Sequence, residues 1–188
     1  MPGTWTGWSF HECRSVPRLS FTVSNDRSTE ADLLRCGYDL GYFDKADITR
    51  WADRQIEACD SPPTELLDLS MIRDTHPIDV MNLLRTFGSP DSSTTIETQI
   101  GFIGLLLAEG KISTQLAIRG LFALVHQPGI THEQASQIYH LDDGYDLAVA
   151  GTYGTMGGIE RDLRQFVFAY ASRLAEQYPQ WIRFTKYE

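Results

Sequence analysis

Residues 92–125 read SSTTIETQIGFIGLLLAEGKISTQLAIRGLFALV, and this stretch gives the clearest indication of the fold class. Its serines at 92–93 can start one helix that runs to Gly110, and Ser113 can start the next. The second helix carries apolar residues over nearly its whole circumference, which is typical of a helix at the centre of a core. The stretch therefore predicts two packed helices inside a helical protein.

Two glycines lie three residues apart inside the first of these helices, at Gly101 and Gly104. Glycine lowers helix propensity by about 1 kcal/mol relative to alanine, so its presence there needs a compensating reason. A close approach of another helix supplies one, because glycine has no side chain to hold the two backbones apart. The pair predicts a tight helix–helix contact.

Helix signals continue toward the N-terminus. Four helices are expected in the first half: one over 30–40, one capped by Asp44, one begun by Pro62-Pro63, and one between Pro77 and Gly88. The connections between them have ordinary lengths for a compact domain.

The helix capped by Asp44 has one apolar stripe and one charged face. The stripe comprises Ile48, Trp51, Ala52, Ile56 and Cys59. On the other face, Arg50 can pair with Asp53 at i,i+3, and Arg54 with Glu57 in the same way. The two carboxylates lie one turn apart, as in the carboxylate sites of helical bundles, but their arginine neighbours favour a solvated face.

Two further helices complete the chain. Thr131 and Gln134 have the capping-box form, and the helix that they begin is expected to be interrupted at Gly144. After the glycine-rich segment GTYGTMGG at 151–158, a last helix carries apolar residues at i,i+4,i+7 spacing and ends at Pro179. The glycine-rich segment lacks a GK[ST] ending, so a loop between helices is favoured over an anion-binding loop.

Residues 1–28 differ from the rest because they lack a helical period. Leu19, Phe21 and Val23 alternate with polar residues, as in a half-buried strand. We expect this arm to dock on the helices through its aromatic residues, Trp5, Trp8 and Phe10. The predicted fold is all-α: a globular array of about eight helices forming a single domain over 29–188, with an extended N-terminal arm at 1–28.

Composition limits the partners. The 188 residues include 25 acidic and 16 basic side chains, which gives a net charge of −9. This charge disfavours nucleic acid and anionic membrane surfaces and favours a basic protein partner. The apolar run at 100–108 is too short to span a membrane. Three cysteines without metal-binding spacing fit a reducing, cytoplasmic compartment and predict no cofactor of their own.

One cluster resembles a metal site. Asp142, Asp143 and Asp146 form a DDxxD pattern, which resembles the aspartate-rich motif of isoprenoid synthases, and His140 lies beside it. On a helix these carboxylates could hold a divalent ion, which predicts a small metal-dependent hydrolase or transferase. The alternative interpretation is a turn at Gly144, in which the aspartates cap a neighbouring helix.

A second resemblance covers residues 40–70. It is carried by Leu40-Gly41, Ile48, Trp51-Ala52-Asp53, Ile56, Pro62-Pro63, Leu66 and Leu69-Ser70. This pattern is similar to a helix-pair signature of uncharacterised bacterial helical proteins, some of which occur beside polymorphic toxins as candidate immunity proteins. The resemblance implies a helical fold and a non-enzymatic role in which the acidic protein covers the site of a basic toxin or nuclease.

Overall fold

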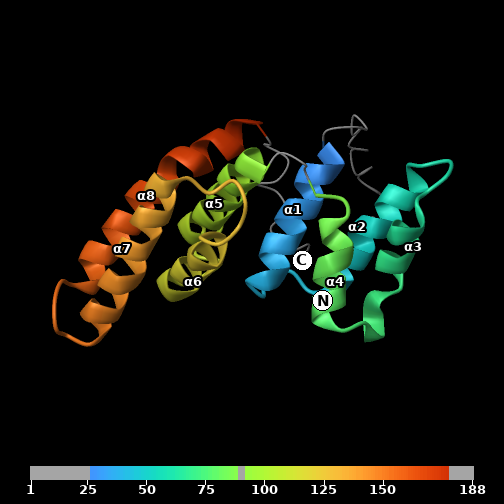
Figure 1. Ribbon diagram of the computed structural model, residues 1–188. Helices are drawn as coiled ribbons and strands as arrows, with labels where there is room; N and C mark the ends of the chain where they lie inside the picture. The colour runs from blue at the N-terminus through green and yellow to red at the C-terminus, as the bar shows by residue number, and fades with distance from the viewer. Residues whose placement is uncertain (1–25, 89–91, 178–188) are drawn as a thin grey trace, which may run out of the picture.

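The computed structural model describes residues 26–88 and 92–177, and within these ranges it contains eight α-helices, one 3₁₀ turn and no strand (Figure 1). The helices are α1 (Asp26–Asp39), α2 (Lys45–Glu57), α3 (Thr64–Ser70), η1 (Ile72–Asp74), α4 (Pro77–Arg85), α5 (Ser92–Ala108), α6 (Thr114–Leu124), α7 (His132–Val149) and α8 (Met156–Gln177). The all-α prediction is confirmed. The predicted strand and aromatic arm lie outside the described residues.

Two predicted boundaries are wrong. Helix α1 begins at Asp26, so 26–28 belong to a helix and not to the arm. Helix α7 runs without a break from His132 to Val149, so Gly144 does not interrupt it. A Cβ at Gly144 would lie 2.7 Å from Ile159 Cδ1, which shows that this glycine admits a side chain of α8. Glycine here makes room between two helices instead of forming a turn.

Helix α5 lies at the centre of the molecule. It packs against α1, α6 and α8, and most of its side chains from Thr95 to Leu107 are buried. Helix α6, predicted to be central, keeps Arg119 and Ala123 exposed. In Figure 1, α1–α4 lie on one side of α5 and α6–α8 lie on the other. The buried apolar residues of both sides form one cluster.

No helix among the described residues combines the length and apolar content needed to cross a membrane.

The most extensive helix contact joins α5 to α8. A Cβ at Gly101 would lie 2.7 Å from the Tyr170 carbonyl oxygen, and one at Gly104 would lie 2.9 Å from Val167 Cβ. Both distances are shorter than the van der Waals contact of a carbon atom with either neighbour. The two helices can approach this closely because both positions are glycine. The predicted tight contact is confirmed.

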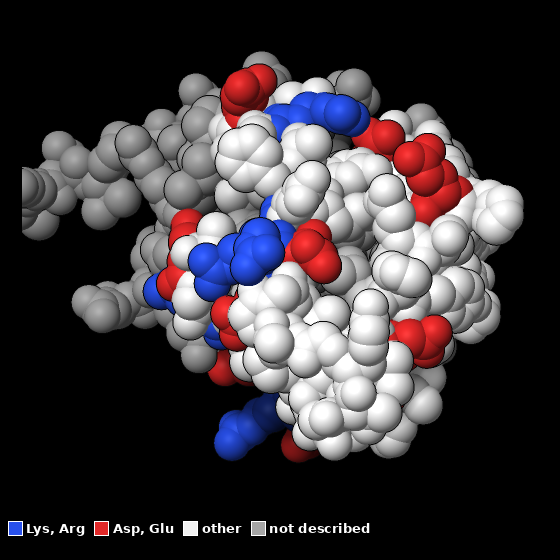
Figure 2. Space-filling view, turned by 90° about the vertical axis from the view of Figure 1, so that its left-hand side faces the viewer, with Lys and Arg blue, Asp and Glu red and all other residues white. Residues whose placement is uncertain are grey.

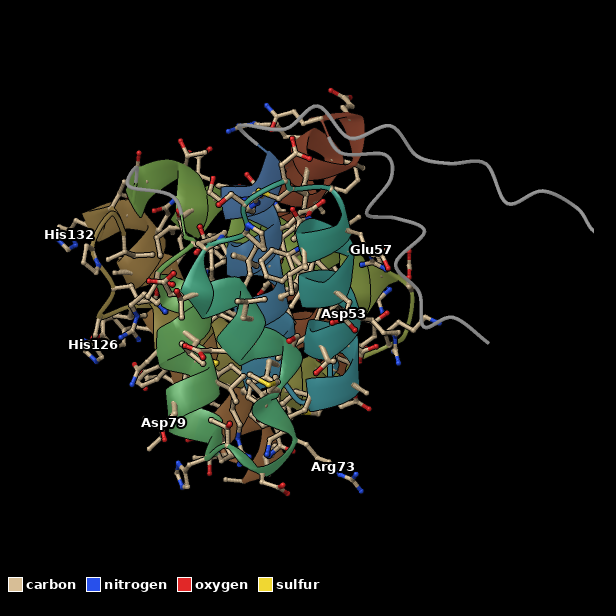
Figure 3. All side chains as sticks on the ribbon, turned by 90° about the vertical axis from the view of Figure 1, so that its right-hand side faces the viewer. Asp53, Glu57, Arg73, Asp79, His126 and His132 are labelled. Atoms are coloured by element: carbon tan, nitrogen blue, oxygen red, sulfur yellow. The ribbon has the colours of Figure 1, made fainter. Side chains whose placement is uncertain are left out.

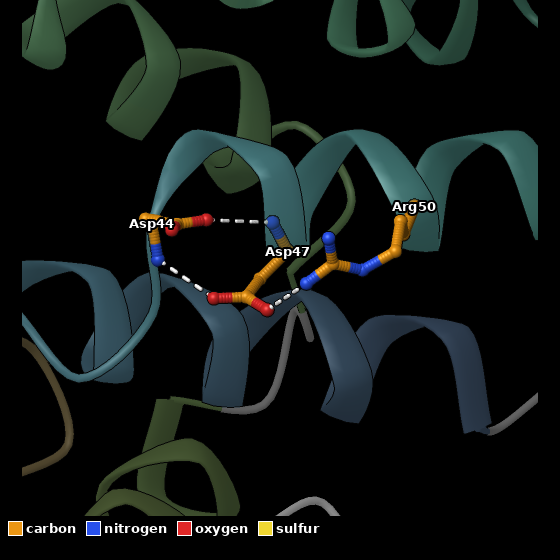
Figure 4. Close-up of polar contacts among 3 residues, drawn as sticks. All are labelled: Asp44, Asp47 and Arg50. Carbon is orange, nitrogen blue, oxygen red and sulfur yellow. Dashed lines mark hydrogen bonds and ion pairs between the residues drawn. The ribbon is translucent and has the colours of Figure 1, made fainter. Parts of the chain in front are cut away.

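The predicted caps are also found. At the start of α2, the Asp47 amide donates to Asp44 Oδ1 and the Asp44 amide donates to Asp47 Oδ2, each over 2.9 Å (Figure 4). The Asp47 carboxylate also pairs with Arg50, which was expected to pair with Asp53. At the start of α7, Thr131 and Gln134 form the second capping box. These side chains satisfy amides that a helix start leaves without partners.

A buried hydrogen-bond network joins α1 to α2. Trp51 Nε1 donates to Glu30 Oε2 over 2.7 Å, and Gln55 Nε2 donates to the same oxygen over 3.0 Å. Both Trp51 and Glu30 are buried, so each satisfies a polar group that would otherwise be desolvated. The apolar stripe of α2 thus contributes a polar link as well as packing.

The buried faces of α3 and α4 are narrower than the sequence indicates. Leu66 and Leu69 are buried as expected, but Leu67 is exposed. On α4, Leu84 is buried, whereas Ile78 is 63% exposed. Both helices are short, and α3 lies at the edge of the molecule while α4 packs between α1 and α3, so the outward sides of both helices leave apolar side chains uncovered (Figure 1).

The α5–α8 contact generates a prediction. Replacing Gly101 by Ala places a methyl group against the Tyr170 carbonyl and Leu174 Cβ, and the backbones must separate to admit it. We expect Gly101→Ala to lower the free energy of unfolding by about 1–3 kcal/mol in urea denaturation. Gly157→Ala is the control, because no described atom lies within 4 Å of its added Cβ. That variant should be neutral or gain up to about 1 kcal/mol, and equal losses in both would contradict the contact.

Candidate binding groove

A groove of about 820 Å³ lies between α7, α8 and the loop that joins them. Its lining combines apolar side chains with a few polar and acidic ones. The lining residues are Gln137, His140, Leu141, Asp143, Gly144, Leu147, Tyr153, Gly154, Thr155, Gly158, Ile159, Asp162, Gln165, Phe166 and Tyr170. The volume lies in the range of ligand-binding sites in proteins.

Local sequence explains how the groove forms. The contact between Gly144 and Ile159 brings α7 close to α8 and sets the floor. The connecting loop then turns at Gly151 and Gly154, whose φ angles of 66° and 76° suit glycine best. Thr155 Oγ1 accepts the Gly158 amide at 3.1 Å and so supports the first turn of α8. Residues 151–155 of the glycine-rich segment therefore form a loop between helices, as the sequence indicated, whereas 156–158 already belong to the first turn of α8.

Both walls of the groove carry an acidic side chain. Asp143 lies on α7 and Asp162 on α8, and no lysine or arginine is among the described residues that line it. The face that carries α7 and α8 shows a broad uncharged area with separate acidic patches and with several Lys or Arg side chains around it (Figure 2). Such a site favours a cationic group that also presents apolar surface, because the carboxylates attract the charge and the apolar walls bury the remainder.

The four predicted metal ligands divide between two faces of α7. His140 and Asp143 line the groove, and Asp142 and Asp146 do not. In the part of the chain that the structure describes, no group of three or more His, Cys, Asp or Glu side chains is placed to hold a metal ion. Divalent metal binding at this cluster stays a prediction from the sequence.

The carboxylates of this cluster nevertheless influence one another. Burial is the main cause that raises the pKa of Asp142 above its ordinary value of 3.8. The negative charges of Asp146 and Asp143 raise this pKa further, whereas the positive charge of Arg119 on α6 lowers it. A cation bound beside the cluster would relieve the repulsion.

The other titratable candidates lie apart from the groove. Asp53 and Glu57 are exposed on α2, and Figure 3 shows them on the opposite side of the view from His126 and His132. His126 packs edge-on against Phe122 with the ring centroids 6.3 Å apart. The helical spacing of Asp53 and Glu57 thus produces a solvated acidic pair, which offers a matched control for the groove.

The sequence did not reveal the apolar part of the groove. Ile159 and Phe166 belong to the apolar residues at i,i+4,i+7 spacing on the last helix, and such spacing by itself predicts a buried face. Leu163 and Val167 are buried, but Ile159 and Phe166 are only half-buried because they border the groove. Tyr153, in the loop, is 77% exposed. The sequence feature that could have indicated the groove is the width of the apolar stripe on the last helix, because the stripe is wider than one buried face requires.

The two described cysteines are expected to differ in reactivity. Cys36 is buried, and burial, followed by the charge of Asp39, raises the pKa of its thiol to about 12. Cys59 lies just beyond the end of α2 and is partly exposed. Because the thiolate is the reactive form, iodoacetamide at about pH 8 should alkylate Cys59 and spare Cys36 until denaturant is added. Peptide mapping of a Cys13→Ser variant tests this, and equal labelling of both thiols in the native protein would contradict it.

The raised pKa of Asp142 predicts a dependence of stability on pH. Folding favours the protonated form, so the charged carboxylate destabilises the native state above its raised pKa, and this cost disappears as pH falls toward 3.8. Asp142→Asn should therefore raise Tm at neutral pH, and the gain should shrink on acidification. Thermal denaturation from about pH 7 downward measures this, with Asp53→Asn as the control for residue type. A Tm gain that grows on acidification would refute the interpretation.

Comparison with protein-family models, curated proteins and solved structures finds no match to this chain.

Proposed function

We propose that the protein is a non-enzymatic interaction module that binds a basic protein partner in the groove between α7 and α8. The observation that carries the proposal is the placement of Asp143 and Asp162 on opposite walls of a largely apolar groove without a lining lysine or arginine. A partner that presents Lys or Arg beside apolar side chains complements this surface. The net charge of −9 would speed the encounter with such a partner.

The end of α7 is also suited to a nearby cation, on a different face of the helix from the groove. Asp146 lies in the last turn of α7, which contains no basic residue. The carbonyl end of a helix carries a partial negative charge, so a carboxylate there costs about 0.3–1 kcal/mol where a cation would be stabilising. Asp146 does not line the groove, so a cation that another molecule supplies at this end of α7 would bind next to the groove and not within it.

The occupant that fits best is an amphipathic helix of the partner. Two neighbouring helices with a groove between them can receive a third helix along their length, and apolar residues at i, i+3, i+4 and i+7 then fill the groove. Leu147, Ile159 and Phe166 would contact those anchors, while Asp143 and Asp162 would face basic residues along the edges.

Neutralisation of a basic toxin or nuclease is a role that agrees with this surface. The resemblance that implies it covers residues 40–70, which lie on α2 and α3 and not on the groove. It therefore concerns the scaffold, and the acidic groove is a separate argument for a cationic partner. Metal-dependent hydrolysis or transfer at Asp142, Asp143 and Asp146 is the alternative, and we place it second because His140 and Asp143 face the groove while the other two carboxylates do not line it.

The test compares two charge reversals of equal size. Asp143→Lys/Asp162→Lys reverses the groove, and Asp53→Lys/Glu57→Lys reverses the exposed acidic pair on α2. Wild type and both variants, as full chains, are immobilised and exposed to lysate of the source organism. Each protein retained in stoichiometric amount is then purified, and its Kd for all three chains is measured at two salt concentrations.

We expect a basic partner that binds the wild type and the α2 variant alike and binds the groove variant at least about tenfold more weakly, which corresponds to about 1.4 kcal/mol. Higher salt should weaken the wild-type complex, because the attraction is electrostatic. Equal affinity of all three chains, or no stoichiometric partner, would overturn the proposal. Circular dichroism of each variant establishes that the fold is retained.

A further inference from the structure

A buried charge lies where the two sides of the molecule meet. Asp32 of α1 is 3% exposed, and its Oδ2 accepts the hydroxyl of Thr95 from α5 over 3.0 Å. The guanidinium of Arg35, one turn further along α1, lies 3.4 Å from Asp32 Oδ1. A buried carboxylate requires such compensation, since desolvation of an unpaired charge costs several kcal/mol.

Two buried polar atoms of α1 and α5 have no hydrogen-bond partner within the described parts of the chain. One is the donor Nε–H of Arg35, and the other is the acceptor Oε1 of Gln99 on α5. Gln99 is only 1% exposed, so bulk water does not satisfy its carbonyl. An unsatisfied buried polar group costs about 1–3 kcal/mol, and a native protein rarely retains one without a partner.

Arg35 and Gln99 line the same small cavity. It has a volume of about 30 Å³ and is bordered by α1, α4, α5, α6 and the residue Gln127 that follows α6. A single water molecule needs about 10–15 Å³ of space measured in this way, so the cavity accepts one or two waters and excludes larger ligands.

We infer that this cavity binds one structural water molecule, which accepts a hydrogen bond from Arg35 Nε–H and donates one to Gln99 Oε1. The chemistry of the two atoms selects this occupant. An anion would accept from Arg35 but cannot donate to the carbonyl, and a cation would satisfy the carbonyl but would face the guanidinium. A neutral molecule that both donates and accepts satisfies both, and water is the one that fits the volume.

The position of the site gives the water a structural role. Arg35 belongs to α1 and Gln99 to α5, and the contact between these helices connects α1–α4 to α5–α8. The water would extend the Asp32–Arg35 pair to α5 and thereby add a polar link across the junction. Buried waters that bridge polar groups in this way are costly to remove.

The test uses Gln99→Met, which keeps the length of the side chain and removes its whole carboxamide, so a lower Tm supports the water only together with its direct observation in the wild-type protein. If the water is bound, the variant loses that hydrogen bond, and Tm should fall by about 2–6 °C. If the cavity is dry, the variant removes an unsatisfied carbonyl, and Tm should stay the same or rise. Gln115→Met, at an exposed position of α6, controls for the change of residue type and should shift Tm by about 1 °C or less.

A second measurement on the wild-type protein observes the water directly. We expect a high-resolution crystal structure to show one ordered water within hydrogen-bond distance of both Arg35 Nε and Gln99 Oε1. In solution, NMR should give a cross-peak between the Arg35 Nε–H proton and a long-lived water. A dry cavity in the crystal, or a Gln99→Met variant at least as stable as the wild type, would overturn the inference.

Discussion

The close contact between α5 and α8 sets the positions of the helices around it. Gly101 and Gly104 let α8 lie directly on α5, and this places a 22-residue helix along the most buried helix of the protein. Helix α7 packs on both α6 and α8, so its position follows from theirs. The groove between α7 and α8 is lined by these two helices and their loop, and by no residue of α5. Without the two glycines, the helices would separate by the width of a methyl group, and the walls of the groove would shift with them.

The other half of the molecule is joined to this layer through α1. Apolar packing supplies most of the contact, but the junction also carries Asp32, Arg35 and Thr95, which are buried or partly buried. Buried polar groups restrict how two helices can pack, because each needs a hydrogen-bond partner in a defined direction, whereas apolar contacts do not. We interpret the junction as the part of the core that fixes how α1 lies on α5. The Trp51–Glu30 hydrogen bond has the same character between α1 and α2.

The C-terminal half of α7 departs from the residue preferences of a stable helix. Asp146 opposes the dipole of α7, and Asp142 bears the repulsion of its two acidic neighbours. Tyr153 and Leu147 expose apolar surface beside them. Elsewhere the chain follows the rules closely, with capping boxes at α2 and α7 and a serine cap at α6. Asp142 and Asp146 do not line the groove, whereas Leu147 and Tyr153 do, so these unfavourable choices lie on more than one face of α7.

Local patterns in the chain were enough to predict the helices, because caps, prolines and apolar periodicity act over a few residues. The α5–α8 contact was also predictable, since two glycines inside one helix lower its propensity and suit a position where another backbone packs closely. Tertiary packing was needed to separate the apolar residues of the core from those that line the groove, and to show that Gly144 receives Ile159 instead of ending a helix. The same holds for the division of the acidic cluster between two faces of α7. These outcomes depend on which helices become neighbours, and a stripe on one helix does not record how much of its width a neighbour will cover.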